Sequence, residues 1–332
     1  KDMGHKKIII TVDESLSEIR IDKAISGILN EYSRMNIKQW IHSGNILVNE
    51  KKVVPKTKLV IGQIISIEPV FENRKETVSE SMDLNIVFED DHIIIINKPY
   101  GLVVHPGTGN MEGTLQNGLL YHHPALSKLP RAGLIHRLDK NTSGLLIIAK
   151  TNLSYKILVS DLQERLITRE YRAICIGVMT SGGTVDANLS RDPNNRIRFK
   201  IMTQGKRAVT HYRVLKKFKH HTFLGLRLET GRTHQIRAHL SHIKYPLIGD
   251  PLYGGRFYTP KGAKEELITK LKYFKRQALH ACLLLFDHPI EKKRMKFEAA
   301  LPEDMESILI EMSEGSLTKD SMNKLIYPEA KV

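Results

Sequence analysis

Residues 133–150 read G-L-I-H-R-L-D-K-N-T-S-G-L-L-I-I-A-K, and this stretch decides the fold. Two apolar runs, at 134–135 and 145–149, flank a short polar centre. Short apolar runs bounded by turn residues predict buried strands, so the centre is expected to be a loop held between two fixed strands. Asp139 stands there among cations and turn donors, which keep a carboxylate ionised and in place. The simpler alternative is that Asp139 only caps the turn and pairs with Arg137.

Length and charge set the broad class. A chain of 332 residues can form two domains, and its net charge of +15 with a pI near 9.6 indicates a polyanionic partner. The two cysteines, Cys175 and Cys282, lie far apart in apolar runs and predict free thiols in a reducing compartment. A protein that merely happens to be basic is the alternative.

Several classes of protein are disfavoured by motifs that the sequence lacks. No apolar run approaches the roughly 20 residues that span a bilayer, and no signal-peptide core follows the basic start, so a cytoplasmic location is expected. Neither a Walker loop nor a dinucleotide-binding glycine motif occurs. His234, His239 and His242 lack H-E-x-x-H spacing, so we expect neither metal nor cofactor.

Residues 20–69 are expected to form a separable unit. An amphipathic helix, a second basic helix that Gly44 can end and a hairpin follow one another in this stretch. The second helix presents Arg34 and Lys38 on one face, and Lys51 and Lys52 occupy the hairpin turn. These four cations are expected to contact RNA phosphates, although an ordinary solvated charged face would look the same.

A helix is predicted after the turn at 230–233, with Thr233 as its cap and Ile236 in its apolar stripe. Arg237 falls just past the first turn of this helix. A cation near a helix N-terminus is disfavoured by the macrodipole. It therefore requires an anion nearby, and the Asp139 carboxylate is the expected partner.

Three motifs carry a resemblance to a known family. H-R-L-D-K-x-T-S-G at 136–144 resembles the catalytic motif of the RluA/RluD family of RNA pseudouridine synthases, and N-K-P-x-G-L-x-V-H-P at 97–106 and E-T-G-R-T-H-Q-I-R-A-H-L at 229–240 are similar to further family motifs. The resemblance is closest to the RluD branch, which modifies the helix 69 loop of large-subunit ribosomal RNA. Residues 20–69 resemble the alpha-L RNA-binding module first known in ribosomal protein S-four.

The resemblance implies an α+β fold. It implies a mixed, mainly antiparallel bent sheet with flanking helices and an active cleft across its middle. We accordingly expect an alpha-L domain at 17–76, a linker at 77–84 and a catalytic domain at 85–325.

The resemblance also assigns the site. Asp139 would be the essential carboxylate and Arg237 its partner. Tyr171 would be the tyrosine that stacks on the uracil and can take the carbon-5 proton, with an aromatic core residue at a strand start as the alternative. Arg137 would fill the space left by the extruded base or contact a phosphate. Lys98, in the second motif, is expected to hold the strand end or the active loop, with a surface lysine as the alternative.

A basic surface for RNA is expected next to the site. Residues 191–217 carry nine Lys or Arg residues against one acidic residue. From this stretch and from the turn that follows, we expect Lys206, Arg207 and Arg232 to bind RNA.

The predicted function is that of a bacterial 23S rRNA pseudouridine synthase, acting as a monomer during ribosome assembly without a cofactor or metal. Converting uridine to pseudouridine exchanges a carbon–nitrogen glycosidic bond for a carbon–carbon bond and consumes no outside reagent. Two alternatives remain open: a non-catalytic RNA-binding or ribosome-assembly protein, and a synthase directed to transfer RNA.

Overall fold

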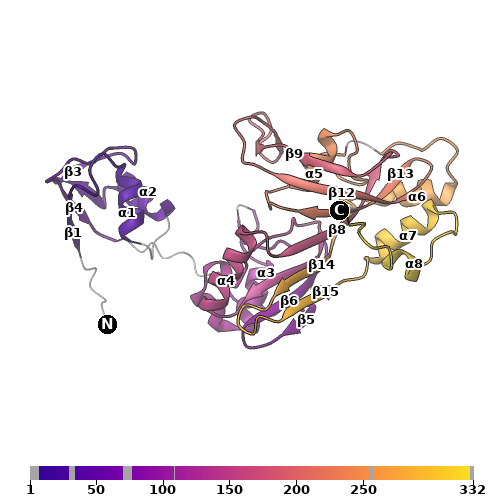
Figure 1. Ribbon diagram of the computed structural model, residues 1–332, viewed down its shortest axis with the longest axis horizontal. Helices are drawn as coiled ribbons and strands as arrows, with labels where there is room; N and C mark the ends of the chain where they lie inside the picture. Colours follow the sequence, from indigo (N-terminus) through magenta and orange to yellow (C-terminus); the bar gives the residue numbers. More distant parts are fainter. Residues whose placement is uncertain (1–6, 30–33, 70–76, 108, 255–256, 330–332) are drawn as a thin grey trace. The chain divides into compact units, whose positions relative to one another are not determined.

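The computed structural model describes residues 7–29, 34–69, 77–107, 109–254 and 257–329, and the chain divides into two compact units, Lys1–Glu76 and Thr77–Val332 (Figure 1). No helix within these described ranges is long and apolar enough to cross a membrane.

The smaller unit is an antiparallel sheet with two helices. Its sheet order is β1-β4-β2-β3, and Ile21, Ile37, Ile46 and Ile65 lie in one buried core. The unit starts earlier than residue 17, because the first strand pairs with β4. Gly44, with φ of 82°, follows the second helix as expected. The elements are β1 (Ile8–Thr11), α1 (Ile21–Ile28), α2 (Arg34–Ser43), β2 (Ile46–Val48), β3 (Lys51–Lys52) and β4 (Ile64–Ile67).

The larger unit is built on a nine-stranded sheet of order β5-β6-β7-β14-β8-β13-β12-β9, with β15 added on β14. All of its pairs are antiparallel except β14 with β7, so the predicted mixed, mainly antiparallel sheet is confirmed. Its strands are β5 (Ile86–Glu89), β6 (Ile93–Lys98), β7 (Ser143–Ala149), β8 (Thr168–Ile176), β9 (Gly183–Asp186), β12 (Val209–Lys217), β13 (His221–Leu228), β14 (Leu279–Asp287) and β15 (Arg294–Glu298); β10 (Leu189–Arg191) and β11 (Phe199–Ile201) form a separate pair.

Helices cover both faces of this sheet (Figure 1). Alternate side chains of β6 show the division, since Ile94 and Ile96 enter one core while Ile93 and Ile95 enter another. α3 (Leu115–His122), the 3₁₀ turns η1 (Pro124–Lys128) and η2 (Pro130–Gly133), and α5 (Gln235–His242) contribute to the first core, which also contains Tyr171. α4 (Asn152–Gln163), α6 (Glu265–Tyr273), α7 (Glu303–Met312) and α8 (Lys319–Asn323) contribute to cores on the opposite face.

Two glycines hold the loop that carries Asp139. Gly133 has φ of 79°, and a Cβ there would lie 2.0 Å from the Ala149 carbonyl oxygen. Gly144 has φ of 119°, and its Cβ would lie 2.2 Å from the carbonyl oxygen of Ala281 on β14. Only glycine permits such close approaches, so these two residues fix where the loop leaves and enters the sheet.

Both ends of the larger unit extend beyond the expected boundaries. Residues 77–84, expected as a linker, belong to this unit: Asn117 Nδ2 donates to the Val78 carbonyl at 2.7 Å, and Glu80 N donates to the Asn117 carbonyl at 3.1 Å. At the other end, past residue 325, buried Tyr327 packs with its ring 4.1 Å from the Arg227 guanidinium.

Candidate active site

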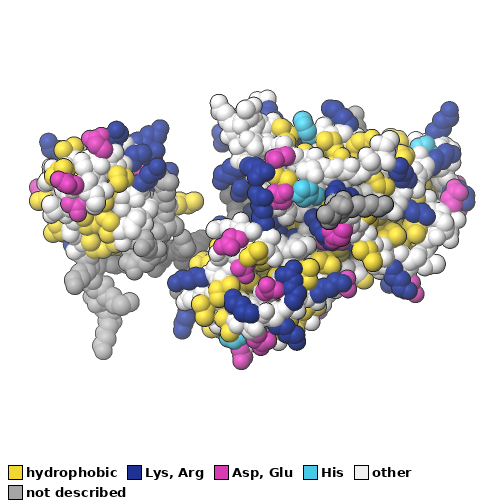
Figure 2. All heavy atoms as spheres, viewed as in Figure 1, with side chains coloured by type: hydrophobic (Ala, Val, Ile, Leu, Met, Phe, Trp, Pro, Cys, Tyr) yellow, Lys and Arg dark blue, Asp and Glu magenta, His cyan; other side chains and the backbone are white. Residues whose placement is uncertain are grey.

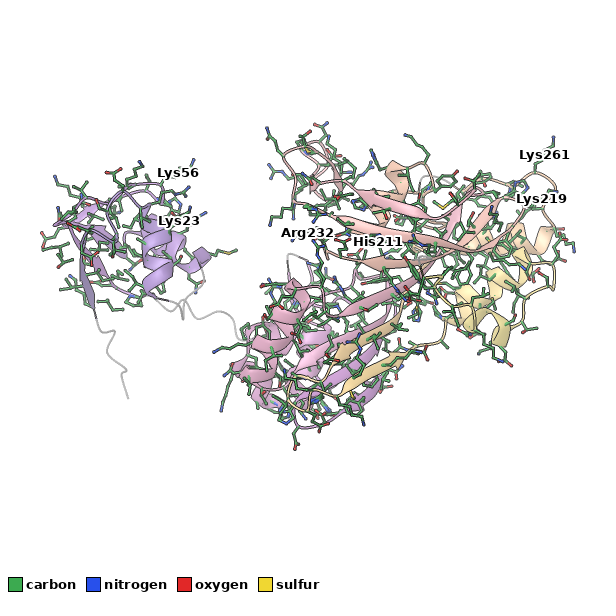
Figure 3. All side chains as sticks on the ribbon, in the orientation of Figure 1. Lys23, Lys56, His211, Lys219, Arg232 and Lys261 are labelled. Carbon is green, nitrogen blue, oxygen red and sulfur yellow. The ribbon has the colours of Figure 1, made fainter. Side chains whose placement is uncertain are left out.

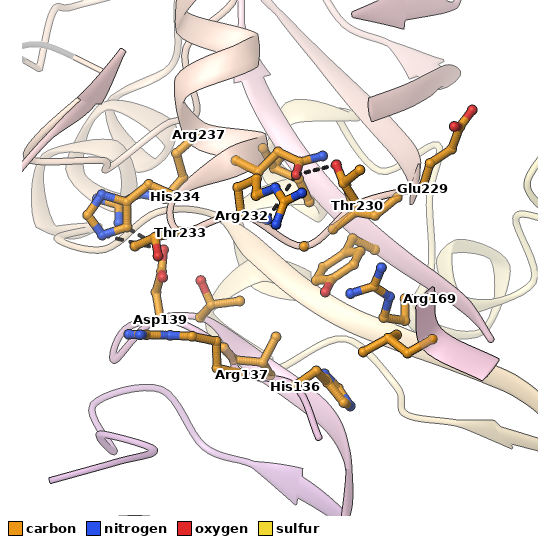
Figure 4. Close-up of a pocket in the computed structure, with 18 of the residues that line it drawn as sticks. His136, Arg137, Asp139, Arg169, Glu229, Thr230, Arg232, Thr233, His234 and Arg237 are labelled. Carbon is orange, nitrogen blue, oxygen red and sulfur yellow. Dashed lines mark hydrogen bonds and ion pairs between the residues drawn. The ribbon is translucent and has the colours of Figure 1, made fainter. Parts of the chain in front are cut away.

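A pocket of about 490 Å³ opens on the face of the sheet that carries Tyr171 (Figure 4). Its walls are the 135–139 loop, β8, the 229–234 turn and the start of α5. Six of the residues predicted from sequence to act on or bind RNA line it: Asp139, Tyr171, Arg237, Arg137, Arg207 and Arg232.

The pocket brings Asp139 and Arg237 together, although 98 residues separate them in sequence. Arg237 Nη1 donates to Asp139 Oδ2 at 3.0 Å. The remaining guanidinium edge is held by Asp250, to which Nε donates at 2.7 Å and Nη2 at 2.9 Å. This bidentate pair fixes the guanidinium plane and leaves Nη1 directed at Asp139.

Burial and charge together define the electrostatics of this pair. Asp250 is 1% exposed, whereas the Asp139 side chain keeps 16% of its surface accessible. Burial lowers the pKa of Arg237, but the hydrogen bonds and charges of Asp250 and Asp139 outweigh it, so the pKa stands above its ordinary value. Arg237 is therefore a permanent cation, and Asp139 has a fixed counter-ion on Oδ2.

His234 gives Asp139 a second polar neighbour. The Tyr253 hydroxyl accepts from Phe199 N at 2.6 Å and lies within hydrogen-bond distance, 2.9 Å, of His234 Nδ1. Nε2 of the same ring lies 3.9 Å from Asp139 Oδ2 (Figure 4). Burial lowers the pKa of His234 despite the nearby Asp139, so the ring is a neutral dipole facing the carboxylate.

The start of α5 differs from the sequence prediction. Thr233 does not cap the helix: the N-cap is His234, in the left-handed region with φ of 56° and without a side-chain cap bond. Gln235 binds the turn instead, because its Oε1 accepts from Arg232 N at 3.0 Å and from Thr230 Oγ1 at 2.7 Å. The amide side chain thus replaces a hydroxyl cap and shapes the wall of the pocket.

Lys98 anchors the Asp139 loop from below. Its buried Nζ donates to the carbonyls of Pro99, Leu102 and Lys140 at 2.8, 2.9 and 3.1 Å. Burial lowers the pKa of Lys98 to about 7, although Asp139 opposes the shift. The expectation that Lys98 holds the active loop is confirmed, since it joins the strand end to the residue after Asp139.

The loop is also tied to the sheet through His136. His136 Nε2 accepts from Ile147 N at 3.1 Å, so the ring must be neutral. Burial, with a smaller contribution from Arg169, lowers its pKa to about 3, which agrees with that role.

Tyr171 and Arg169 form the inner wall on β8. They are two residues apart on one strand and share a face. Tyr171 is buried, and burial raises its pKa, with Arg169 opposing and Asp139 adding to the shift. Its ring is available as an apolar surface for a planar ligand.

Cations surround the pocket mouth. Arg131, Arg137, Arg165, Arg207 and Arg232 all line it and are exposed. Arg232 Nε donates to the Arg207 carbonyl at 3.1 Å. Figure 3 shows that Arg232 lies at the end of the larger unit away from Lys219 and Lys261. Lys and Arg side chains gather around this part of the surface in Figure 2. Lys206, also predicted to bind RNA, is exposed but does not line the pocket.

The other predicted RNA contacts lie in the smaller unit. Lys38, Lys51 and Lys52 are exposed there. Arg34 begins α2, but its side chain lies outside the described residues.

Sequence reasoning missed Asp250, His234 as a neighbour of Asp139, and Arg169. Asp250 sits in a Gly-Asp-Pro sequence that is typical of an ordinary turn, so nothing local pointed to Arg237. The alternation along β8 could have indicated Arg169, because it must share a face with Tyr171.

The arrangement presents a fixed carboxylate to the pocket. Arg237 binds Oδ2, and within the described ranges Oδ1 of Asp139 has no hydrogen-bond donor, so Oδ1 is the atom left for a substrate. Among those same residues, no group of three His, Cys, Asp or Glu side chains could hold a metal ion.

Comparisons with known proteins identify the family. The model of the RNA pseudouridylate synthase family matches residues 92–242. The fold is similar to that of a human protein, RNA pseudouridylate synthase domain containing 4, with a TM-score of 0.54 and 26% identity over 69% of this chain and 92% of that chain.

Curated relatives are closer in sequence. Ribosomal large subunit pseudouridine synthase D of Yersinia pestis is 49% identical over 90% of this chain and 92% of its own length. The protein of the same name from Escherichia coli K12 is 48% identical over 91% and 93%. The chain therefore belongs to the RNA pseudouridylate synthase family. Within this family, it is similar over most of its length to proteins named for the large ribosomal subunit.

Proposed function

We propose that the protein isomerises specific uridines of large-subunit (23S) ribosomal RNA to pseudouridine, in the helix 69 loop, during ribosome assembly. The observation that carries the proposal is the 3.0 Å contact between Arg237 and Asp139 inside a pocket with an arginine-lined mouth. Relatives whose names specify this class of substrate support it.

The geometry supports the following catalytic roles. Arg237 pairs with Asp139 and aims it, and Oδ1 faces the sugar of the target uridine, as nucleophile at carbon 1′ or as base on a sugar proton. Tyr171 stacks on the uracil while the base is detached and turned, and carbon 5 then bonds to carbon 1′. A base then removes the proton from carbon 5 and N1 takes up one proton from solvent, so atoms and charge balance without an outside reagent.

The target nucleotide must leave its helical stack to reach Oδ1, because the carboxylate lies inside a pocket. Arg137, two residues before Asp139 in sequence, is exposed and lines the pocket, and it fills the vacated space or contacts a phosphate. Lys206, Arg207 and Arg232 bind the phosphate backbone around the mouth, which adds affinity without reading sequence.

The smaller unit acts as an alpha-L RNA-binding domain. Its support is a basic second helix followed by a hairpin that exposes Lys51 and Lys52, with exposed Lys38 on α2. These cations hold a ribosomal RNA segment while the larger unit works on its uridine. The enzyme acts as a monomer in the bacterial cytoplasm.

The experiment is a map of pseudouridines in ribosomal RNA from cells that lack the gene. We expect the helix 69 pseudouridines to disappear and to return when the wild-type gene is restored. Loss confined to transfer RNA would assign the enzyme to that substrate instead. An unchanged map in both RNAs would favour a non-catalytic assembly protein.

A further inference from the structure

Two arginines are buried in the pocket, and only one of them is paired. Arg237 and Arg169 are each 6% exposed. Arg237 has two carboxylates, at 2.7 and 3.0 Å. The Arg169 side chain has no hydrogen bond or ion pair with any residue the structure describes, and its buried Nε is left without an acceptor. A buried guanidinium without partners is costly, so this position requires a functional reason.

The surroundings keep the Arg169 guanidinium open to the pocket. It lies at the end of the pocket away from Asp139 (Figure 4). On its other side is Gly231, where a Cβ would lie 2.7 Å from Arg169 Nη1. A side chain at position 231 would push the guanidinium aside, so the glycine preserves the space that Arg169 occupies.

We infer that Arg169 binds a carbonyl oxygen of the target uracil and stabilises the negative charge that the base gains when it is detached. This inference rests on the proposed function. When the bond between carbon 1′ and N1 breaks, the electron pair stays on the uracil and spreads to O2 and O4. Asp139 balances the charge on the sugar, either through a bond from Oδ1 to carbon 1′ or by taking a sugar proton.

Position and burial favour the base over a phosphate. Tyr171, on which the uracil stacks, shares a strand face with Arg169 and lines the same pocket as Asp139. The charges of both groups shift the pKa of its hydroxyl. Phosphates stay hydrated and are bound by the exposed arginines at the mouth, such as Arg207, whose side chain is 54% exposed. A guanidinium buried beside the stacking ring instead faces a group that has left water, as the flipped base has.

The test combines stability with single-turnover kinetics of Arg169→Met, which keeps the apolar stem and removes the charge. We expect the rate of tritium release from carbon-5-labelled RNA at saturating enzyme to fall about a hundredfold, as for loss of an oxyanion-hole donor. Thermal stability should be unchanged or higher, because an uncompensated buried charge is removed. The same substitution at exposed Arg294, on β15, is the matched control and should change neither quantity.

Sulfur substitution in the substrate identifies the contacted atom. With 2-thiouridine or 4-thiouridine at the target position, one of the two should slow the wild type and reduce the Arg169→Met penalty at least fivefold. If a methylphosphonate beside the target removes the penalty instead, Arg169 binds a phosphate and the inference is wrong. It is equally wrong if Arg169→Met reacts at the wild-type rate, or loses activity only in proportion to lost folding. A wild type inactive on every ribosomal RNA substrate would instead overturn the proposed function.

Discussion

Replacing Asp250 by Asn tests whether Arg237 is held in place from behind. Three donors converge on Asp250 Oδ1: Arg237 Nη2 at 2.9 Å, Leu252 N at 2.9 Å and Tyr253 N at 3.1 Å. The amide oxygen of Asn should therefore take the Oδ1 position. Its NH₂ then faces Arg237 Nε, which donated to Oδ2 at 2.7 Å, and two donors meet.

The size of the effect follows from that lost bond. A hydrogen bond to a charged group contributes about 1.5–3 kcal/mol, so the free energy of unfolding should fall by about 2 kcal/mol. The same freedom lets the guanidinium leave the plane that directs Nη1 to Asp139. At about 1.4 kcal/mol per factor of ten, the single-turnover rate should drop about 10- to 100-fold.

The assays are urea unfolding, single-turnover tritium release and RNA binding. RNA affinity should stay at the wild-type value, because Asp250 is buried behind Arg237 and does not line the pocket. Asp287→Asn is the matched control: it breaks an exposed pair with Arg294 and should cost less than about 1 kcal/mol. Asp250→Asn with a rate within twofold of wild type would refute the view that Asp250 positions Arg237.

Three further changes test the loop and the rim. Lys98→Met removes three hydrogen bonds to loop carbonyls and should lower activity. The pKa of Lys98 falls from 10.5 to about 7 on folding, so the folded state binds fewer protons than the unfolded state between these pH values. The melting temperature of wild type relative to Lys98→Met should therefore rise from about pH 7 to about pH 10. Gly144→Ala places a Cβ against the Ala281 carbonyl at positive φ and should cost at least about 2 kcal/mol in urea unfolding, whereas alanine at Gly107, with nothing near its Cβ, should not. Arg232→Ala should weaken RNA binding and reduce the slope of log affinity against log salt by about 1, and an unchanged slope would remove Arg232 from the RNA contacts.

The parts of the site that were predictable are those encoded locally. The apolar runs on either side of the Asp139 loop predict its position. Only the second run forms a strand, β7 at 143–149, whereas Leu134 in the first run makes a single bridge to Ile148. The pairing of Arg237 was predictable because a cation in the first turn of a helix requires an anion, and the structure supplies two carboxylates.

What sequence could not give depends on contacts made only in the folded chain. Thr233 was a reasonable cap, yet the left-handed backbone at His234 moves the start of α5 and leaves Gln235 to bind the turn. Residues 77–84 look like a linker because they lack apolar periodicity. Their place on α3 rests on side-chain to backbone bonds, such as that from Asn117 to Val78, which leave no trace in composition.

Single-turnover tritium release by Asp139→Asn is the most direct measurement of the central claim, that one carboxylate aimed by Arg237 carries out the reaction. Asn keeps the size of the side chain and an acceptor for Arg237 Nη1, so folding and RNA affinity should stay close to wild type. We expect no measurable release of tritium from carbon-5-labelled ribosomal RNA. Release at the wild-type rate from RNA bound with wild-type affinity would show that the chemistry belongs to another residue.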